Sequence, residues 1–249
     1  LSLYNSEATD EALQYIVHLQ GLEQLNLADT KITDDGLKQL TKLKPLKRLH
    51  LANTTIGDEG VANISGMSLE HINLWRTNVT DQALRYLSKI KSLEVLCLMW
   101  VDIGDPGLTY LKDLNQLKGL SLNETKITDK GIESLKDLTE LEHLDLSDTA
   151  VSDLGIKHLS NLKNLKELDL YGTNVSDNGL EFLISLPSLE KIQLPSHGSI
   201  TDKGMASISK IGSLKKLDLT GEFTDQGLTH LLKLKNLERL RIDAVNHQK

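Results

Sequence analysis

The chain contains few residues whose types and spacing could support catalysis or metal binding. Its single cysteine, Cys97, could act as a nucleophile only with a histidine within hydrogen-bonding distance. In the predicted strand arrangement His71 lies diagonally across from Cys97, and such pairs are about 7–8 Å apart. His143, Asp145 and Asp169 have the side chains of metal ligands, but open strands rarely bring ligands together, and neither H-x-x-x-H nor C-x-x-C occurs. We therefore expect no enzyme activity, no cofactor and no metal site.

Residues suited to binding are more prominent, and we call the main group the tryptophan patch. It consists of Trp75, Arg76, Met99 and Trp100. Trp and Arg are enriched at binding hot spots and are costly to leave exposed, so the patch predicts the centre of a protein interface. Two alternatives stay open: one ring packs locally on the sheet, or these positions do not face solvent. Three further residues are predicted to lie alongside and to contact the same partner: His50, His71 and Cys97.

A second group, the acidic tract, consists of Glu124, Asp145, Asp148 and Asp169, with Glu167 nearby. Carboxylates gathered on one surface could attract a basic partner or loosely hold a cation. A charged run on an open surface is also often only solvated. Both interpretations stay open at this point.

These residues must be positioned by a repeat that runs through the chain. Ten in-phase starts, 23–25 residues apart, indicate a solenoid. We predict a single domain over residues 1–249 with about 11 units, the first truncated at 1–21 and the last a terminal strand unit over 237–249. Because Leu1 and Leu3 occupy buried strand positions without a cover, we expect further repeats or a cap before them in the natural protein. The units begin at Leu22, Leu46, Leu69, Leu93, Leu117, Leu141, Leu165, Leu189, Leu214 and Leu237.

Each unit follows the pattern L-x-x-L-x-L-x-x-T-x-I-T-D-x-G-L-x-x-L-x-x-L. The L-x-L step has a period of two, which predicts a short strand with one buried face. From D-x-G-L onward, apolar residues recur every three positions, which predicts a short helix. A Thr or Ser followed by Asp, as at Thr128 and Asp129, can cap the first N–H groups of that helix. The fifth, seventh and eighth residues of each unit are then expected to face solvent.

Two columns of small residues are predicted to be structural. A glycine follows two residues after the Asp, and its replacement by Ala12 and Ala83 indicates that small size is required where the helix approaches its neighbour. A threonine recurs where the strand turns outward, and its hydroxyl is expected to bond the backbone of the adjacent coil. These threonines are Thr30, Thr54, Thr77, Thr125, Thr149 and Thr173.

With this repeat over essentially all its length, the chain resembles the leucine-rich-repeat superfamily. The I-T-D-x-G-L step is most similar to the ribonuclease-inhibitor-like, cysteine-containing branch, and bacterial leucine-rich-repeat proteins and the repeat arms of F-box substrate receptors look similar. The resemblance implies an α/β solenoid, a right-handed horseshoe with a parallel sheet on the concave face and short helices on the convex face. It implies a non-catalytic module that binds a protein or peptide; the alternatives are a substrate-recognition arm of a ubiquitin ligase and a structural or adhesive spacer of a larger surface protein.

Composition narrows the class of partner. A net charge of −7 and a pI near 5.6 argue against nucleic acid, and no apolar run approaches the ~20 residues of a membrane span. Eleven strands ~4.8 Å apart would span roughly 48 Å of open concave arc, which suits a protein or peptide better than a small metabolite. We expect a monomer, and the sequence indicates no cellular compartment.

Overall fold

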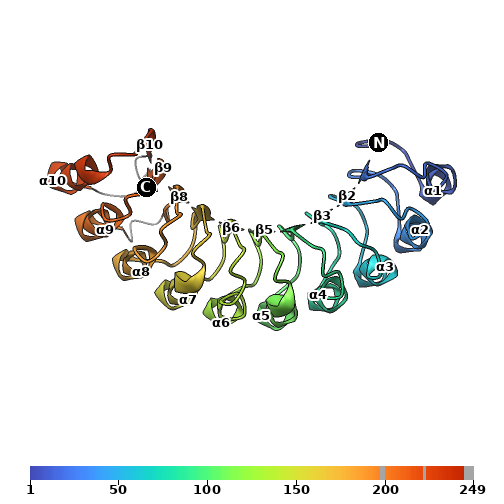
Figure 1. The fold of residues 1–249 in the computed structure, drawn as a ribbon, viewed down its shortest axis with the longest axis horizontal. Helices are drawn as coiled ribbons and strands as arrows, with labels where there is room; N and C mark the ends of the chain where they lie inside the picture. The colour runs from blue at the N-terminus through green and yellow to red at the C-terminus, as the bar shows by residue number, and fades with distance from the viewer. Residues whose placement is uncertain (197–199, 221–222, 244–249) are drawn as a thin grey trace, which may run out of the picture.

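The chain forms an open arc with strands on its inner side and helices on its outer side (Figure 1). This computed structural model describes residues 1–196, 200–220 and 223–243. Within those ranges, ten strands form one parallel sheet in sequence order. The predicted solenoid, with a concave sheet and convex helices, is confirmed. The strands are β1 (Gln24–Asn26), β2 (Arg48–His50), β3 (His71–Asn73), β4 (Val95–Cys97), β5 (Gly119–Ser121), β6 (His143–Asp145), β7 (Glu167–Asp169), β8 (Lys191–Gln193), β9 (Lys216–Thr220) and β10 (Arg239–Asp243).

A short helix follows each L-x-L step and lies on the convex side (Figure 1). Strands pack about 4.8 Å apart while packed helices need about 8–10 Å, and this difference bends the array toward its strands. The described helices all lack the length and apolar character that crossing a membrane requires. The α-helices are α1 (Asp10–Ile16), α2 (Asp34–Leu40), α3 (Asp58–Ile64), α4 (Asp81–Leu87), α5 (Asp105–Leu108), α6 (Asp129–Glu133), α7 (Asp153–His158), α8 (Asp177–Leu183), α9 (Asp202–Ile208) and α10 (Asp225–Thr229). The 3-10 segments are η1 (Thr109–Asp113), η2 (Leu159–Asn161) and η3 (His230–Lys233).

The two ends of the array differ from its middle. The truncated first unit contributes one isolated bridge, Ser2 to Asn26, instead of a strand. The predicted terminal unit forms β10, and its residues 244–249 lie outside the described part of the chain.

The strands expose their third and fifth unit positions on the concave face. In β6, for example, Leu144 is buried while His143 and Asp145 on either side of it are accessible. At the seventh position, which was expected to face solvent, Trp75 and Tyr171 are exposed but Ala28 and Ala52 are buried. The reason is a turn: the eighth residue adopts a left-handed conformation in unit after unit and carries the chain away from the sheet.

Five of the six column threonines are buried and Thr30 is half-buried, but the hydrogen-bond partner of the column differs from the expected one. Thr149 Oγ1 donates to the carbonyl oxygen of Leu146 at 2.6 Å, within its own coil and not in the adjacent one. The other five threonines do the same with the residue three positions earlier. Because the chain turns at the eighth position, the carbonyl of the sixth residue lies within reach of the threonine hydroxyl.

The aspartate at the start of each helix links that helix to the next coil. Asp129 Oδ1 accepts from the backbone N–H groups of Ser152 and Gly155 at 2.7 and 2.9 Å, and its Oδ2 accepts from Ser152 Oγ at 2.6 Å. An ideal Cβ on Gly155 would lie 2.6 Å from Asp129 Oδ1. The repeated glycine is therefore small because this carboxylate occupies the space beside it.

A row of charges lies at the second position of the units, just before each strand, and it alternates in sign except between the neighbours Glu70 and Glu94. Lys118 pairs with Glu94 at 3.1 Å, and Lys166 pairs with Glu142 at 2.7 Å. Lys47–Glu70 and Lys215–Glu190 repeat this arrangement near the two ends. These exposed pairs each add little stability, but together they favour one order of neighbouring coils.

Candidate binding surface on the concave side

The tryptophan patch lies on two adjacent coils, just beyond the ends of β3 and β4. Trp75 and Trp100 are 40% and 54% exposed, Arg76 is exposed, and Met99 is half-buried. The backbone N–H of Arg76 donates to the carbonyl oxygen of Met99 at 3.0 Å, which places the two coils side by side at this point. The patch is therefore at the rim of the concave face, where the chain leaves the sheet.

Two patch residues adopt a backbone conformation that their side chains disfavour. Arg76 and Trp100 have φ values of 53° and 57°. The same position is otherwise Asn, Asp or Gly in most units, the residue types that tolerate a left-handed backbone best; Glu124 is a further exception. A bulky residue there costs roughly 1–2 kcal/mol, and strain of this kind is concentrated at functional sites. Local folding does not require a tryptophan here.

The three residues predicted beside the patch lie on the sheet itself. His50 is at the end of β2, His71 begins β3 and Cys97 ends β4. Burial, with the charge of Arg48, lowers the pKa of both imidazoles, and burial raises the pKa of the Cys97 thiol. Both histidines are therefore neutral at pH 7, and the thiol is protonated.

The register separates Cys97 from His71. Cys97 pairs with Asn73, whereas His71 pairs with Val95, so the histidine and the cysteine are diagonal neighbours. A protonated thiol without an adjacent base is a poor nucleophile. Groups of three or more His, Cys, Asp or Glu arranged to hold a metal are not found among the described residues.

The acidic tract divides into two parts in the structure. Asp145 and Asp169 are register partners in β6 and β7, half-buried on the concave face. Glu124 and Asp148 are exposed at the left-handed eighth position of their coils, beyond the strands. The four carboxylates therefore do not form one continuous site.

Asp145 and Asp169 also have a structural role that their spacing did not reveal. Asp145 Oδ1 accepts from Ser147 N–H at 2.9 Å, and Asp169 Oδ1 accepts from Tyr171 N–H at 2.9 Å. Asn73 accepts from Trp75 N–H in the same way. An oxygen at the fifth position thus stabilises the turn that ends the strand.

A hollow of about 350 Å³ lies on the concave face over β4–β8. The sequence pattern did not predict the hollow, because the third position of each unit was not among those expected to face solvent. The residues that leave the space are Gly119 and Ser121 of β5, which are small where neighbouring strands carry larger side chains. Comparing the third positions of successive units would have revealed the gap at Gly119. The hollow is lined by Val95, Gly119, Leu120, Ser121, His143, Leu144, Asp145, Glu167, Leu168, Asp169, Lys191 and Gln193.

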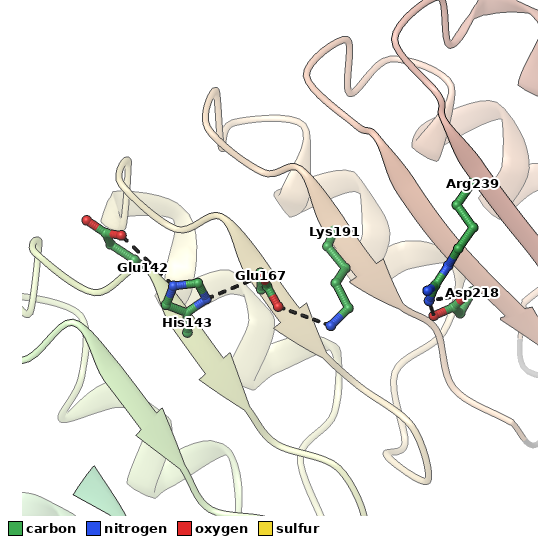
Figure 2. Close-up of polar contacts among 6 residues, drawn as sticks. All are labelled: Glu142, His143, Glu167, Lys191, Asp218 and Arg239. Atoms are coloured by element: carbon green, nitrogen blue, oxygen red, sulfur yellow. Dashed lines mark hydrogen bonds and ion pairs between the residues drawn. The ribbon is translucent and has the colours of Figure 1, made fainter. Parts of the chain in front are cut away.

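A chain of charges crosses the strands beside this hollow (Figure 2). Glu167 pairs with Lys191 Nζ at 3.0 Å, and its other oxygen lies 3.7 Å from His143 Nδ1. Glu142 lies 4.0 Å from the opposite ring nitrogen of His143. Further along the sheet, Arg239 pairs with Asp218 at 2.9 Å.

The electrostatic environment of Asp169 is unusual for a carboxylate on an open sheet. Burial raises the pKa of Asp169 to about 6, and the charges of Asp145 and Asp148 add to the shift. The Tyr171 N–H and Lys191 act in the opposite direction. Asp169 therefore titrates near neutral pH, because the Tyr171 N–H and Lys191 do not fully offset the cost of burying its charge.

Comparisons with known proteins agree with this fold. A model of leucine-rich repeats in two copies matches residues 139–178, and a single leucine-rich-repeat model matches residues 18–40 and 42–65. These matches, over three stretches of the chain, agree with the solenoid geometry and show that the repeats are leucine-rich repeats. The matched models do not distinguish the ribonuclease-inhibitor-like branch from others. No curated protein matches the sequence.

Solved structures with the same fold include two internalins of Listeria monocytogenes. The internalin inlF is 21% identical with a TM-score of 0.63, over 96% of this chain and 66% of that one. The internalin C2 (inlC2) is 25% identical with a TM-score of 0.53, over 98% of this chain and 80% of that one. The chain thus spans just under two thirds of the first internalin, and the likeness to that protein is one of fold.

Proposed function

We propose that this chain is a non-catalytic module that binds a protein or peptide partner on its concave side, with the tryptophan patch at the centre of the interface. The observation that carries the proposal is Trp100, a tryptophan 54% exposed on a left-handed backbone where most other units have Asn, Asp or Gly. Exposure and backbone strain both oppose folding. A partner that buries Trp100 accounts for both.

Three features of the surroundings support this function. Trp75 and Met99 extend the apolar surface, and Arg76 adds a charged side chain of a type common at hot spots. The underlying sheet is rigid, so little ordering is needed on binding. In this proposal the module is a monomer, the partner is a protein and not nucleic acid, and His50, His71 and Cys97 lie at the edge of the contact.

The test starts with isolation of the partner by affinity capture on the intact chain. We expect Trp75→Ala and Trp100→Ala each to weaken binding of that partner by roughly 2 kcal/mol, about 30-fold in Kd. Tyr110→Ala is the matched control, because Tyr110 is equally exposed at 40% but lies in η1 on the convex side. Calorimetry gives the affinities, and thermal melting checks the fold.

The outcome that contradicts the proposal is specific. If both tryptophan variants bind as tightly as the parent, or lose binding only by unfolding, the patch is local packing. Equal losses for Tyr110→Ala would show that the effect is not confined to the concave side.

A further inference from the structure

The hollow over β4–β8 has dimensions and a lining that suit one long side chain from outside the molecule. On β5 the third and fifth positions are Gly119 and Ser121, while the third positions on the two neighbouring strands are Val95 and His143. The space exists because β5 carries these small residues. At about 350 Å³, it holds a side chain but not a folded element.

Carboxylates outnumber cations in the lining. The lining contains three carboxylates, Asp145, Glu167 and Asp169, and one lysine, Lys191. Glu167 is paired with Lys191 and approaches His143, as Figure 2 shows. Within the described residues, Asp145 and Asp169 form no ion pair. The hollow thus keeps a net negative charge that this chain does not neutralise.

Much of the remaining lining is apolar. Val95 contributes a partly exposed side chain beside the carboxylates, whereas Leu120, Leu144 and Leu168 also border the hollow but are at most 2% exposed. A compact hydrated ion gains nothing from such surface. A lysine or arginine side chain does, because its aliphatic stem packs on apolar groups while its head remains at the charged end.

We propose that this hollow receives a lysine or arginine side chain of the partner protein, with its stem against Val95 and the gap at Gly119 and its cationic head at Asp145 and Asp169. The inference rests on the proposed protein-binding function and deepens it. The hollow would be a charge-selective contact on the sheet, separate from the apolar contact at the tryptophan patch.

The titration of Asp169 provides a readout for a cation in the hollow. Burial, aided by Asp145 and Asp148, already raises the pKa of this carboxyl to about 6. A cationic head in the hollow would stabilise the charged form and lower that pKa. Because His143, Glu167 and Lys191 face the same space, their titrations have to be followed in parallel.

The test uses blocked peptides with the sequence Gly-Ser-Gly-X-Gly-Ser-Gly, added to the ¹⁵N-labelled chain. X is arginine or lysine in the probes and citrulline in the control, since citrulline has the shape of arginine without its charge. We expect shifts confined to the amides of Gly119, Ser121, Asp145 and Asp169, with at least five-fold weaker binding of the citrulline peptide. Shifts spread evenly over the exposed carboxylates of the whole surface would overturn the proposal.

Variants of the chain test the shape of the hollow and its charge separately. Gly119→Val fills the hollow, and its Cβ would meet Val95 Cγ1 at 3.4 Å, an ordinary contact distance. Asp169→Asn removes the charge but keeps the acceptor for Tyr171 N–H. Each should weaken the arginine and lysine peptides at least five-fold, and Ser121→Val serves as a second filling variant if Gly119→Val does not fold. Asp113→Asn, a change of an exposed carboxylate in η1 on the convex side, is the control and should change affinity less than two-fold.

Unchanged binding in a folded Gly119→Val or Ser121→Val variant would also overturn the proposal. Such a failure would leave the proposed function standing, since that function is tested through Trp75 and Trp100 with the captured partner. Conversely, loss of the tryptophan effect would not alter the peptide result.

Discussion

At the scale of single residues, the concave surface combines side chains that hold the fold with side chains that the fold does not need. Asp169 does both, because one of its oxygens ends β7 through the Tyr171 N–H while its charge is poorly compensated. Trp100 has no comparable structural bond from its side chain among the described residues. The two residues therefore differ in whether their side chain forms a hydrogen bond that stabilises the fold.

The charge on Asp169 makes folding stability depend on pH in a predictable direction. Because the folded-state pKa, about 6, exceeds the ordinary value of 3.8, the folded chain holds this proton more tightly than the unfolded chain. Stability from this group is therefore highest below about pH 4 and falls as pH rises toward 6. Asp169→Asn should stabilise the chain at pH 7.5 by about 1 kcal/mol, a value reduced for solvent screening, and by almost nothing at pH 4.

Urea denaturation at pH 7.5 and pH 4 measures this difference. Asp113→Asn, a change of an exposed carboxylate in η1, is the control and should alter neither midpoint appreciably. A lower midpoint for Asp169→Asn at both pH values would show that the carboxylate is needed as a charge and that burial does not dominate its environment.

At the scale of elements, the aspartate at the start of a helix accepts hydrogen bonds from the next coil and so links the two, as Asp129 does. We expect Gly155→Ala to destabilise the chain by about 1 kcal/mol, because its methyl group would displace Asp129 and break the bond from the residue 155 N–H. Gly155→Leu should cost more, through overpacking against Val151 as well. Asp129→Ala should cost about 2–3 kcal/mol, because it leaves three donors without their acceptor.

Chemical denaturation of the three variants measures these costs. Ala83 occupies the equivalent position in α4, so Ala83→Gly is a useful comparison and should change stability little. If Gly155→Ala were as stable as the parent, the carboxylate would move aside at no cost, and the glycine would reflect only helix packing.

The elements themselves could be predicted from the sequence, whereas the bonds between them could not. The period of two in L-x-L and the period of three after D-x-G-L are local, and they correctly predicted strands such as β6 and helices such as α7. The acceptor of Thr149 and the role of Asp129 depend on how successive coils face each other. No periodicity within one unit encodes that geometry. The hollow at Gly119 went unpredicted for the same reason, since it appears only when neighbouring strands are compared.

At the scale of the whole molecule, each coil contacts mainly its two neighbours, so stability is expected to vary along the array. Leu240 and Ile242 of β10 are 42% and 46% exposed, whereas Leu144 and Leu146 in the middle are 2% and 0% exposed. We expect the amides of β10 to exchange with deuterium markedly faster than those of β5 and β6.

Hydrogen exchange followed by mass spectrometry resolves this gradient. Peptides from the middle of the array serve as the internal reference. Equal protection from β1 to β10 would mean that the array opens only as a single cooperative unit, and that nearest-neighbour reasoning does not apply to it.

The charges before the strands determine whether removal of a repeat brings like or opposite charges together. Excising one repeat, residues 141–164, would remove Glu142 and bring Lys118 beside Lys166, two like charges. Excising two, residues 117–164, would instead bring Glu94 beside Lys166 and restore an attractive pair. Asp105 would then face the hydroxyl and amide of Ser176 in place of those of Thr128. In this stretch, shortening by one coil therefore brings like charges together and shortening by two does not, whereas removal of residues 69–92, where Glu70 and Glu94 interrupt the alternation, would leave Lys47 beside Glu94.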